Sequence, residues 1–142
     1  MQVAVLGCSG GIGGDSRTTA LLLDQDVLID CGTGVGDLTL EDMLRIDHVF
    51  LTHGHLDHVA LLPMLADAGV GRRATPLTAY ALPEIIATLQ DCLFNGRVWP
   101  DYTMLPRRII PTCVCCRYKS ARPWCWVRVA SRRYRCGMRY QR

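Results

Sequence analysis

The segment 52–58 holds three of the four histidines of this 142-residue chain, together with one aspartate. It reads THGHLDH and directly follows a short apolar run, so its polar side chains gather at the end of a predicted strand. Neutral imidazoles and carboxylates are donors that zinc, manganese and iron accept in proteins. His53 and His55 are two residues apart, so in an extended segment both side chains project to one side. Asp57 and His58 follow as the chain turns, and can face a second point nearby.

This segment, which we call the metal loop, therefore predicts ligands for two divalent metal ions. Two such ions about 3.5–4 Å apart can share one water, lower its pKa and make it a hydroxide nucleophile near neutral pH. The loop thus predicts a metal-dependent hydrolase, with zinc as the expected metal and manganese or iron as alternatives. His48 lies outside the cluster, and we interpret it as a structural side chain at a strand end.

The rest of the sequence predicts a layered α/β protein of one domain. Hydrophobic residues make up 49% and charged residues 20%, which excludes a disordered or collagen-like chain. Apolar runs predict strands at 1–7, 18–23, 27–31, 48–51 and 76–81, and helical spacing predicts helices at 39–44, 59–68 and 83–94. Thr39 is the expected N-cap of the first helix. The metal loop itself is expected to be a polar turn.

The run His53–His58 matches in full the H-x-H-x-D-H metal loop of the metallo-β-lactamase superfamily, and the chain resembles these metallohydrolases. The earlier run Val27–Gly32, an apolar stretch followed by Asp-x-Gly, resembles another segment of the same fold. The resemblance implies an α/β fold, namely the N-terminal half of a metallo-β-lactamase αββα sandwich.

The same resemblance implies two divalent metal ions as cofactors and gives each residue of the loop a role. His53 and His55 would ligate the first ion. Asp57 and His58 would ligate the second, and Asp57 would also act catalytically by holding or deprotonating the attacking water. Asp30 would lie behind the metal loop and orient its ligands. Two further histidines and a bridging aspartate are implied downstream, but no histidine follows His58.

A narrower resemblance, to the class II cyclic-nucleotide phosphodiesterases, covers residues 1–106. It is carried by the metal loop together with Leu6–Gly11 and Leu93–Tyr102, the second of which combines Phe-Asn with Trp-Pro-Asp. It implies hydrolysis of a 3′,5′-cyclic nucleotide, cyclic AMP in the first place, to the 5′-monophosphate. A metal-bound hydroxide would attack phosphorus while both metals stabilise the transition state. The expected partner is therefore a small-molecule cyclic nucleotide, rather than nucleic acid or a membrane.

Several alternatives stay open. Other branches of the superfamily share the metal loop, so an RNA-processing nuclease, a thioesterase or a sulfatase is also compatible with it. The segment Gly7–Gly13 with Asp30 resembles the dinucleotide loop of short-chain dehydrogenases. Those enzymes need a Tyr-x-x-x-Lys pair, and the only lysine, Lys119, stands four residues after Cys115. We therefore interpret the glycine-rich segment as a tight strand connection, with a contact to substrate phosphate as the alternative.

The composition changes near Pro106 and predicts two parts. Residues 1–106, the N-terminal half of the hydrolase domain, hold all 13 acidic side chains. Residues 107–142 form a basic Cys/Arg-rich tail outside that fold, with no acidic side chain and five of the eight cysteines. Two alternatives are a zinc knuckle, formed by Cys113 and Cys116 with Cys125 and Cys136, and a non-catalytic nucleic-acid-binding tail. We favour translation of a GC-rich gene in a shifted frame from about codon 107, which would truncate the hydrolase by removing its second half, with the downstream ligands.

The sequence also predicts where the protein resides. No apolar run reaches the roughly 18–20 residues that a membrane span needs. The chain starts without a basic segment before its apolar run, so no secretory signal is expected. The prediction is a cytoplasmic protein with reduced thiols, and no particular oligomeric state is indicated.

Overall fold

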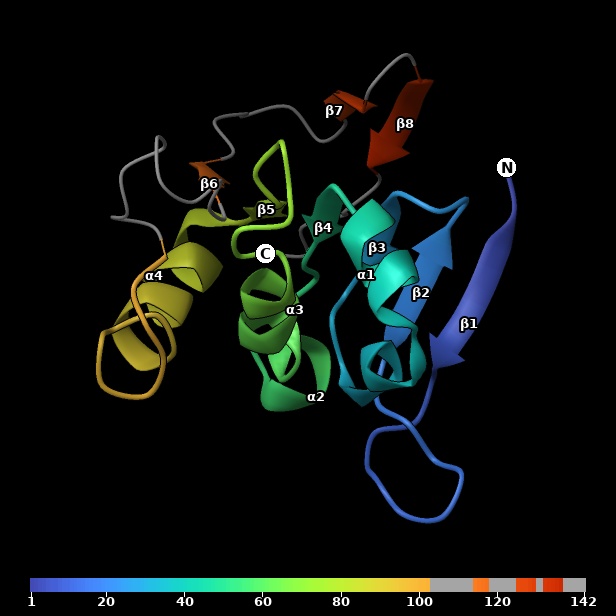
Figure 1. The fold of residues 1–142 in the computed structure, drawn as a ribbon, viewed down its shortest axis with the longest axis horizontal. Helices are drawn as coiled ribbons and strands as arrows, with labels where there is room; N and C mark the ends of the chain where they lie inside the picture. The colour runs from blue at the N-terminus through green and yellow to red at the C-terminus, as the bar shows by residue number, and fades with distance from the viewer. Residues whose placement is uncertain (103–113, 118–124, 130–131, 137–142) are drawn as a thin grey trace, which may run out of the picture.

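The fold is one six-stranded sheet with helices packed on one face (Figure 1). The computed structural model describes residues 1–102, 114–117, 125–129 and 132–136. The strands of the sheet are β1 (Val3–Gly7), β2 (Ala20–Leu23), β3 (Val27–Ile29), β4 (His48–Phe50), β5 (Thr78–Ala81) and β6 (Val114–Arg117). They lie side by side in chain order, antiparallel from β1 to β3 and parallel from β3 to β6. A separate antiparallel pair is formed by β7 (Cys125–Val129) and β8 (Arg132–Cys136).

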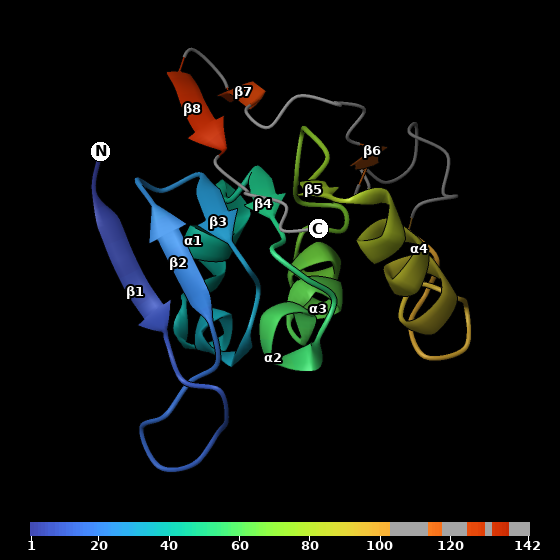
Figure 2. The same cartoon turned by 180° about the vertical axis from the view of Figure 1, so that it is seen from behind.

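The described part of the chain contains four helices. The opposite views in Figures 1 and 2 show how they lie against the sheet. The helices are α1 (Leu40–Arg45), α2 (Leu56–Val59), α3 (Leu62–Ala68) and α4 (Pro83–Cys92), and a 3-10 turn covers Thr33–Asp37. The predicted N-cap of α1 is confirmed, since the Thr39 hydroxyl accepts a hydrogen bond from the backbone N–H of Asp42. Among the described helices, none has both the length and the apolar character needed to cross a bilayer. The α/β class predicted from the sequence is confirmed.

The main hydrophobic core lies between the sheet and the helices. Alternation along the strands places Leu28 and Val49 in this core, where both are fully buried with Leu65 of α3. Val27 and Phe50 belong to a second, smaller cluster. Burying one large aliphatic side chain stabilises a fold by about 1.5–3 kcal/mol, so the layer between sheet and helices is the main source of hydrophobic stabilisation.

The predicted elements before residue 95 are confirmed to within two residues, except the helix expected at 59–68. The structure divides this region into α2, which begins at Leu56, and α3. Pro63 near the start of α3 has no N–H to donate to the carbonyl four residues earlier, so the helical hydrogen bonds are interrupted. The prediction of a polar turn is therefore wrong for the last three residues of the metal loop, which form the first turn of α2.

The glycine-rich loop after β1 joins two antiparallel strands, which confirms its interpretation as a strand connection. The dinucleotide alternative is wrong, because such a loop leads from a strand into a helix, whereas this one leads into β2. In both views the loop projects from the end of the sheet (Figures 1 and 2). Gly13 and Gly14 have φ values of 144° and 52°, which glycine adopts without the strain that a Cβ would add.

Beyond residue 105 the sequence shows no alternating or helical pattern, yet the residues that the structure describes there form three strands. β6 pairs in parallel with β5. The edge of β5 offers backbone donors and acceptors whatever side chains its neighbour carries, so no sequence pattern is needed for this pairing. The domain boundary at residue 106 and the shifted-frame hypothesis stay predictions. Cys113, the first cysteine of the alternative zinc knuckle, lies outside the described residues.

Where the chain leaves β3, it passes very close to the backbone of α2. The N–H of Cys31 donates a hydrogen bond to the carbonyl of His58, at 2.6 Å. A Cβ on Gly32 would lie 2.5 Å from the carbonyl oxygen of Asp57 and 2.4 Å from the hydroxyl oxygen of Thr18. A side chain at this position would push the two segments apart, so glycine sets how near α2 lies to the end of β3.

We expect Gly32→Ala to lower the free energy of unfolding by about 1–3 kcal/mol, because the added methyl group must displace backbone oxygens. Gly11→Ala is the matched control, since a Cβ there meets nothing within 4 Å. It should stay within about 1 kcal/mol of the parent chain. Urea denaturation followed by circular dichroism measures both. Equal stability of the two variants would contradict the close packing assigned to Gly32.

A buried arginine ties together the connections that lead into β4 and β5. The Arg73 side chain is only 4% exposed. Its guanidinium donates hydrogen bonds to the Asp47 carboxylate at 3.1 Å, to the carbonyl of Met43 at 2.7 Å and to the carbonyl of Ile46. Burial lowers the pKa of this guanidinium, and the neighbouring Asp47 carboxylate opposes the shift. The segment after α3 is thus fastened to the segment between α1 and β4.

Replacing Arg73 with methionine keeps an apolar stem of similar length but removes these three hydrogen bonds. Because two backbone carbonyls lose their partner, we expect the free energy of unfolding to fall by about 2–3 kcal/mol. The exposed neighbour gives the control, and Arg72→Met should change stability by less than about 0.5 kcal/mol. Thermal unfolding of both variants tests the contrast, and a loss as large for Arg72 as for Arg73 would refute it.

Candidate metal centre

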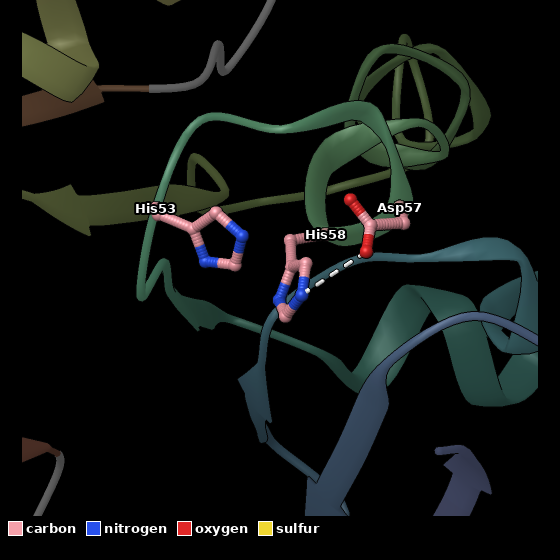
Figure 3. A group of neighbouring side chains, drawn as sticks. All are labelled: His53, Asp57 and His58. Atoms are coloured by element: carbon pink, nitrogen blue, oxygen red, sulfur yellow. Dashed lines mark ion pairs between the residues drawn. The ribbon is translucent and has the colours of Figure 1, made fainter. Parts of the chain in front are cut away.

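The metal loop runs from the end of β4 into α2. It brings together polar side chains that precede the helix and polar side chains in its first turn. His53 precedes the helix, and His55 is its N-cap residue. Asp57 and His58 lie in the first turn. In Figure 3 the side chains of His53, Asp57 and His58 point toward one another. One ligand atom from each of these three lies within 4.8 Å of the other two.

The structure brings together three of the four predicted ligands and leaves the fourth beside them. The imidazole centroids of His53 and His58 are 3.8 Å apart. His55 is exposed, and its ring stands edge-on to His53, with 4.8 Å between the centroids. Within the described residues, His55 is not part of the group whose ligand atoms converge. Its ring nevertheless contacts the ring of His53, which belongs to that group.

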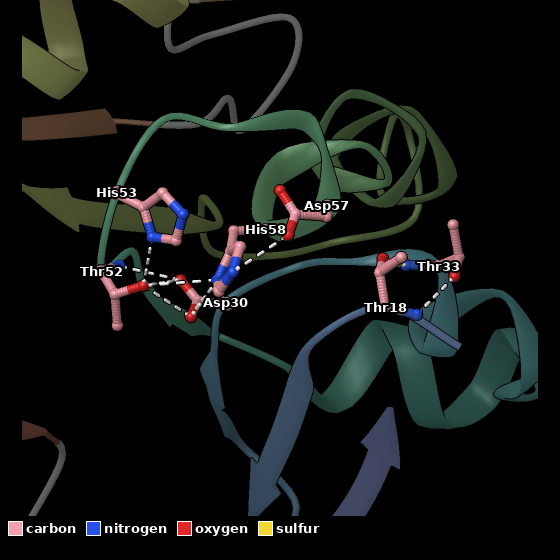
Figure 4. Close-up of polar contacts among 7 residues, drawn as sticks. All are labelled: Thr18, Asp30, Thr33, Thr52, His53, Asp57 and His58. Atoms are coloured by element: carbon pink, nitrogen blue, oxygen red, sulfur yellow. Dashed lines mark hydrogen bonds and ion pairs between the residues drawn. The ribbon is translucent and has the colours of Figure 1, made fainter. Parts of the chain in front are cut away.

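Behind these side chains lies the buried carboxylate of Asp30, which is 2% exposed. It accepts a hydrogen bond from the backbone N–H of Thr52 at 2.8 Å, and its second oxygen lies 2.8 Å from Nδ1 of His58 (Figure 4). Asp30 has a φ of 57°, a left-handed conformation that aspartate tolerates better than most residues. Its position behind the metal loop is the one that the family resemblance implies.

Asp30 determines which nitrogen of His58 is available for a ligand. A carboxylate only accepts hydrogen bonds, so at 2.8 Å the Nδ1 of His58 is the protonated nitrogen. In the neutral ring the lone pair is then on the other nitrogen, Nε2, and Oδ2 of Asp57 lies 3.4 Å from that nitrogen. Histidines that bind metals typically show this arrangement, with one nitrogen anchored by a carboxylate and the other free.

The flanking backbone is fastened by a reciprocal pair of threonines (Figure 4). The N–H of Thr18 donates to the hydroxyl of Thr33 at 2.9 Å, and the N–H of Thr33 donates to the hydroxyl of Thr18 at 2.8 Å. Thr18 is 4% exposed, so both bonds are shielded from water on its side. They join the residues just before β2 to the segment just after Asp30, which limits the movement of that carboxylate.

Cys31 is a nearby thiol that does not supply a ligand. It is fully buried, and burial raises the pKa of its thiol well above the usual range, with a further rise from the neighbouring Asp30 carboxylate. The thiolate is the form that binds metals, so a thiol held neutral in the core is an inert apolar side chain.

His48 is confirmed as a structural side chain. Its Nδ1 lies 3.1 Å from the hydroxyl of Tyr80 on the neighbouring strand, and the two rings are in contact, with centroids 5.7 Å apart. Partial burial lowers the pKa of His48, an effect that outweighs the opposing charges of Asp47 and Asp26. The residue lies at the start of β4, whereas the metal loop follows the end of that strand.

Thr52 is the residue that the sequence analysis missed. Its hydroxyl oxygen lies 2.8 Å and 3.0 Å from the two oxygens of Asp30, and 3.1 Å from Nδ1 of His53. The only sequence signal was its place directly before the first histidine of the motif. That signal carries no meaning until the fold places Asp30 beneath it.

The side chains present fit a divalent metal ion of the zinc type. Two imidazoles and a carboxylate converge, and they are the donors that such ions prefer. One imidazole is already anchored through its other nitrogen by a buried carboxylate, as bound histidines are. The centre is half-buried, so it is open to solvent on one side.

Comparison with known families supports this description. The sequence profile described as cAMP phosphodiesterases class-II matches residues 39–120, which is more than half of the chain and includes the whole metal loop.

Among curated proteins the chain is similar to enzymes named ribonucleases. Ribonuclease Z of Rippkaea orientalis (strain PCC 8801 / RF-1) is 33% identical over 108 residues, covering 69% of this chain and 34% of that relative. Ribonuclease BN of Enterobacter sp. (strain 638) is 32% identical over 116 residues, covering 73% of this chain and 38% of that relative. The chain therefore spans little more than a third of the length of these relatives.

Solved structures share the fold at low sequence identity. The unliganded yeast PDE1 structure gives a TM-score of 0.60 at 19% identity, over 86% of this chain and 53% of that chain. The metallo-beta-lactamase fold protein YhfI from Bacillus subtilis gives 0.56 at 20% identity, over 94% and 56%. Zn(2+)-bound PqqB from Methylobacterium extorquens gives 0.52 at 20% identity, over 82% and 46%. The profile match and this shared fold lead to one conclusion: the chain belongs to the class-II cAMP phosphodiesterase family, hydrolases of the metallo-β-lactamase fold.

Proposed function

We propose that this chain forms the first part of the metal centre of a phosphodiesterase that hydrolyses a 3′,5′-cyclic nucleotide, cyclic AMP in the first place, to the 5′-monophosphate. The observation that carries the proposal is the convergence of His53, Asp57 and His58 over the buried Asp30. The profile of the class-II family, which matches the segment containing these ligands, supports the choice of substrate.

In this proposal two divalent ions bind at the metal loop, zinc first, with manganese or iron as alternatives. His53 and His55 hold the first ion. Asp57 and His58 hold the second. When bound, such ions supply Lewis-acid stabilisation of the phosphoryl oxygens and lower the pKa of a nearby water. The solved structure of PqqB with bound Zn(2+) on the same fold supports zinc.

The protein side chains would orient the reactants and move the proton. The Asp57 side chain is 34% exposed, so one of its oxygens can hold the attacking water and take up its proton. His58 is kept in place by the bond between its Nδ1 and Asp30, which leaves Nε2 as the nitrogen that can bind an ion. Asp30 is too deeply buried to touch a substrate, so its role is to position His58.

A second candidate function is RNA cleavage. The observation that favours it is the match of about 70% of this chain to enzymes named ribonuclease Z and ribonuclease BN. Hydrolysis of RNA and of a cyclic nucleotide break the same kind of phosphodiester bond, so the metal loop serves either reaction. The two candidates differ in what contacts the substrate outside the metal loop.

We expect His53→Ala to weaken metal binding by roughly tenfold or more, because it removes one of the converging donors. The matched control is His48→Ala, which removes a histidine outside the cluster and should leave affinity unchanged. Titration of the full chain with cobalt(II) in place of zinc measures both. Visible bands without thiolate charge-transfer bands would separate this site from metal bound by cysteines. Equal affinities for the two variants would refute the site.

We expect the metal-loaded chain to hydrolyse cyclic AMP, and Asp57→Asn to lower that rate by at least about a hundredfold, because the amide cannot take up a proton. The test compares cyclic AMP with a labelled RNA under the same conditions, with His48→Ala as control. RNA cleavage without cyclic AMP hydrolysis would support the second candidate. Intact metal binding with no hydrolysis of either substrate would refute a catalytic function for this chain.

A further inference from the structure

We propose that Thr52 is a positioning residue. Its hydroxyl donates a hydrogen bond to the buried Asp30 and accepts one from His53, and this fixes which nitrogen of the His53 imidazole is protonated. The inference rests on the proposed function only for its consequence for metal binding. The proton arrangement itself is a property of the metal-free chain.

Thr52 is anchored on the carboxylate of Asp30 by its backbone and by its side chain. Its backbone N–H donates to Oδ1 of Asp30 at 2.8 Å. Its hydroxyl oxygen lies 3.0 Å from Oδ1 and 2.8 Å from Oδ2. The threonine is thus held at two points, and its hydroxyl oxygen stands between the buried Asp30 and the ring of His53 (Figure 4).

The hydroxyl of Thr52 lies between two possible partners, the carboxylate of Asp30 and Nδ1 of His53, and it has one proton to donate. A threonine hydroxyl carries a single proton, whereas a carboxylate has none to give. If that proton pointed elsewhere, lone pairs of the hydroxyl would face lone pairs of two carboxylate oxygens within 3.0 Å. The proton is therefore donated to Asp30, and only acceptor capacity remains on the hydroxyl oxygen. Nδ1 of His53, 3.1 Å away, must then be the donor.

Protonation of Nδ1 decides which nitrogen of His53 can bind a metal ion. With Nδ1 protonated, a neutral ring carries its lone pair on Nε2, which becomes the nitrogen able to bind a metal. A free imidazole side chain in water favours the opposite form, with the proton on Nε2. Thr52 thus selects the less common form and makes His53 ready to bind before any ion arrives.

The effect of Thr52 is specific to His53. His58 bonds directly to Asp30 at 2.8 Å and is 3.4 Å from the Thr52 hydroxyl, so its protonation does not need the threonine. In the described part of the chain, the ring of His55 makes no side-chain hydrogen bond, and its one ring contact is with His53. The buried carboxylate of Asp30 therefore determines which nitrogen is protonated in two histidines, directly in His58 and through Thr52 in His53.

The test is long-range proton–nitrogen NMR of the metal-free full chain with labelled histidines, near pH 8, where an ordinary imidazole is neutral. We expect His53 to be protonated on Nδ1 in the parent chain and in Thr52→Ser, which keeps the hydroxyl. In Thr52→Val, which keeps the branched shape and the backbone N–H, His53 should shift toward the Nε2-protonated form. His58 should remain protonated on Nδ1 in all three.

Cobalt(II) affinity provides the second measurement. We expect Thr52→Val to bind roughly tenfold more weakly than the parent and Thr52→Ser to restore most of that loss. An unchanged His53 pattern in Thr52→Val would overturn the inference. A joint change of His53 and His58 would also overturn it, because that result indicates a general loss of local structure. A His53 shift in a chain that binds no metal would support the inference and refute the proposed function instead.

Discussion

The burial of the Asp30 carboxylate is the constraint on which the rest of the centre depends. A buried carboxylate is costly unless its oxygens are fully hydrogen-bonded, and here the donors come from segments that are distant in sequence. Thr52 approaches from the end of β4 and His58 from α2, 28 residues away along the chain. Any movement of the metal loop would leave the carboxylate unpaired, so the same bonds that stabilise the fold hold the histidines in position.

The sheet topology explains why these groups meet. β3 and β4 are parallel neighbours, with Ile29 opposite Phe50. The residues that follow them, Asp30 and the start of the metal loop, therefore emerge at the same edge of the sheet, where α/β proteins commonly bind ligands. Gly32 allows the backbone of α2 to approach this edge. The pairing of β3 with β4 and the close approach of α2 therefore place the backbone, and the backbone positions determine where the side chains of the centre meet.

The three histidines of the metal loop are not held equally firmly. His58 and His53 are connected to the buried carboxylate, directly or through Thr52, whereas His55 is exposed and lies against His53 only. Ligands that are already held in place lose less conformational entropy when an ion binds. The family profile extends to residue 120, and the chain spans just over a third of its curated relatives. In the described part of the chain, the histidines of the metal loop that are best held in place are the two connected to Asp30, namely His53 and His58.

The sequence by itself determined the metal loop, the family and most strands and helices, because donor types, apolar spacing and caps such as Thr39 are local properties. It did not determine that α2 begins at Leu56, since that depends on how the loop packs against the end of β3. Only the tertiary structure decided that His55 stands apart and that Thr52 contacts His53 and Asp30. Those relations join residues far apart in the chain, and local sequence pattern holds no record of which distant carboxylate will be buried beneath a given histidine.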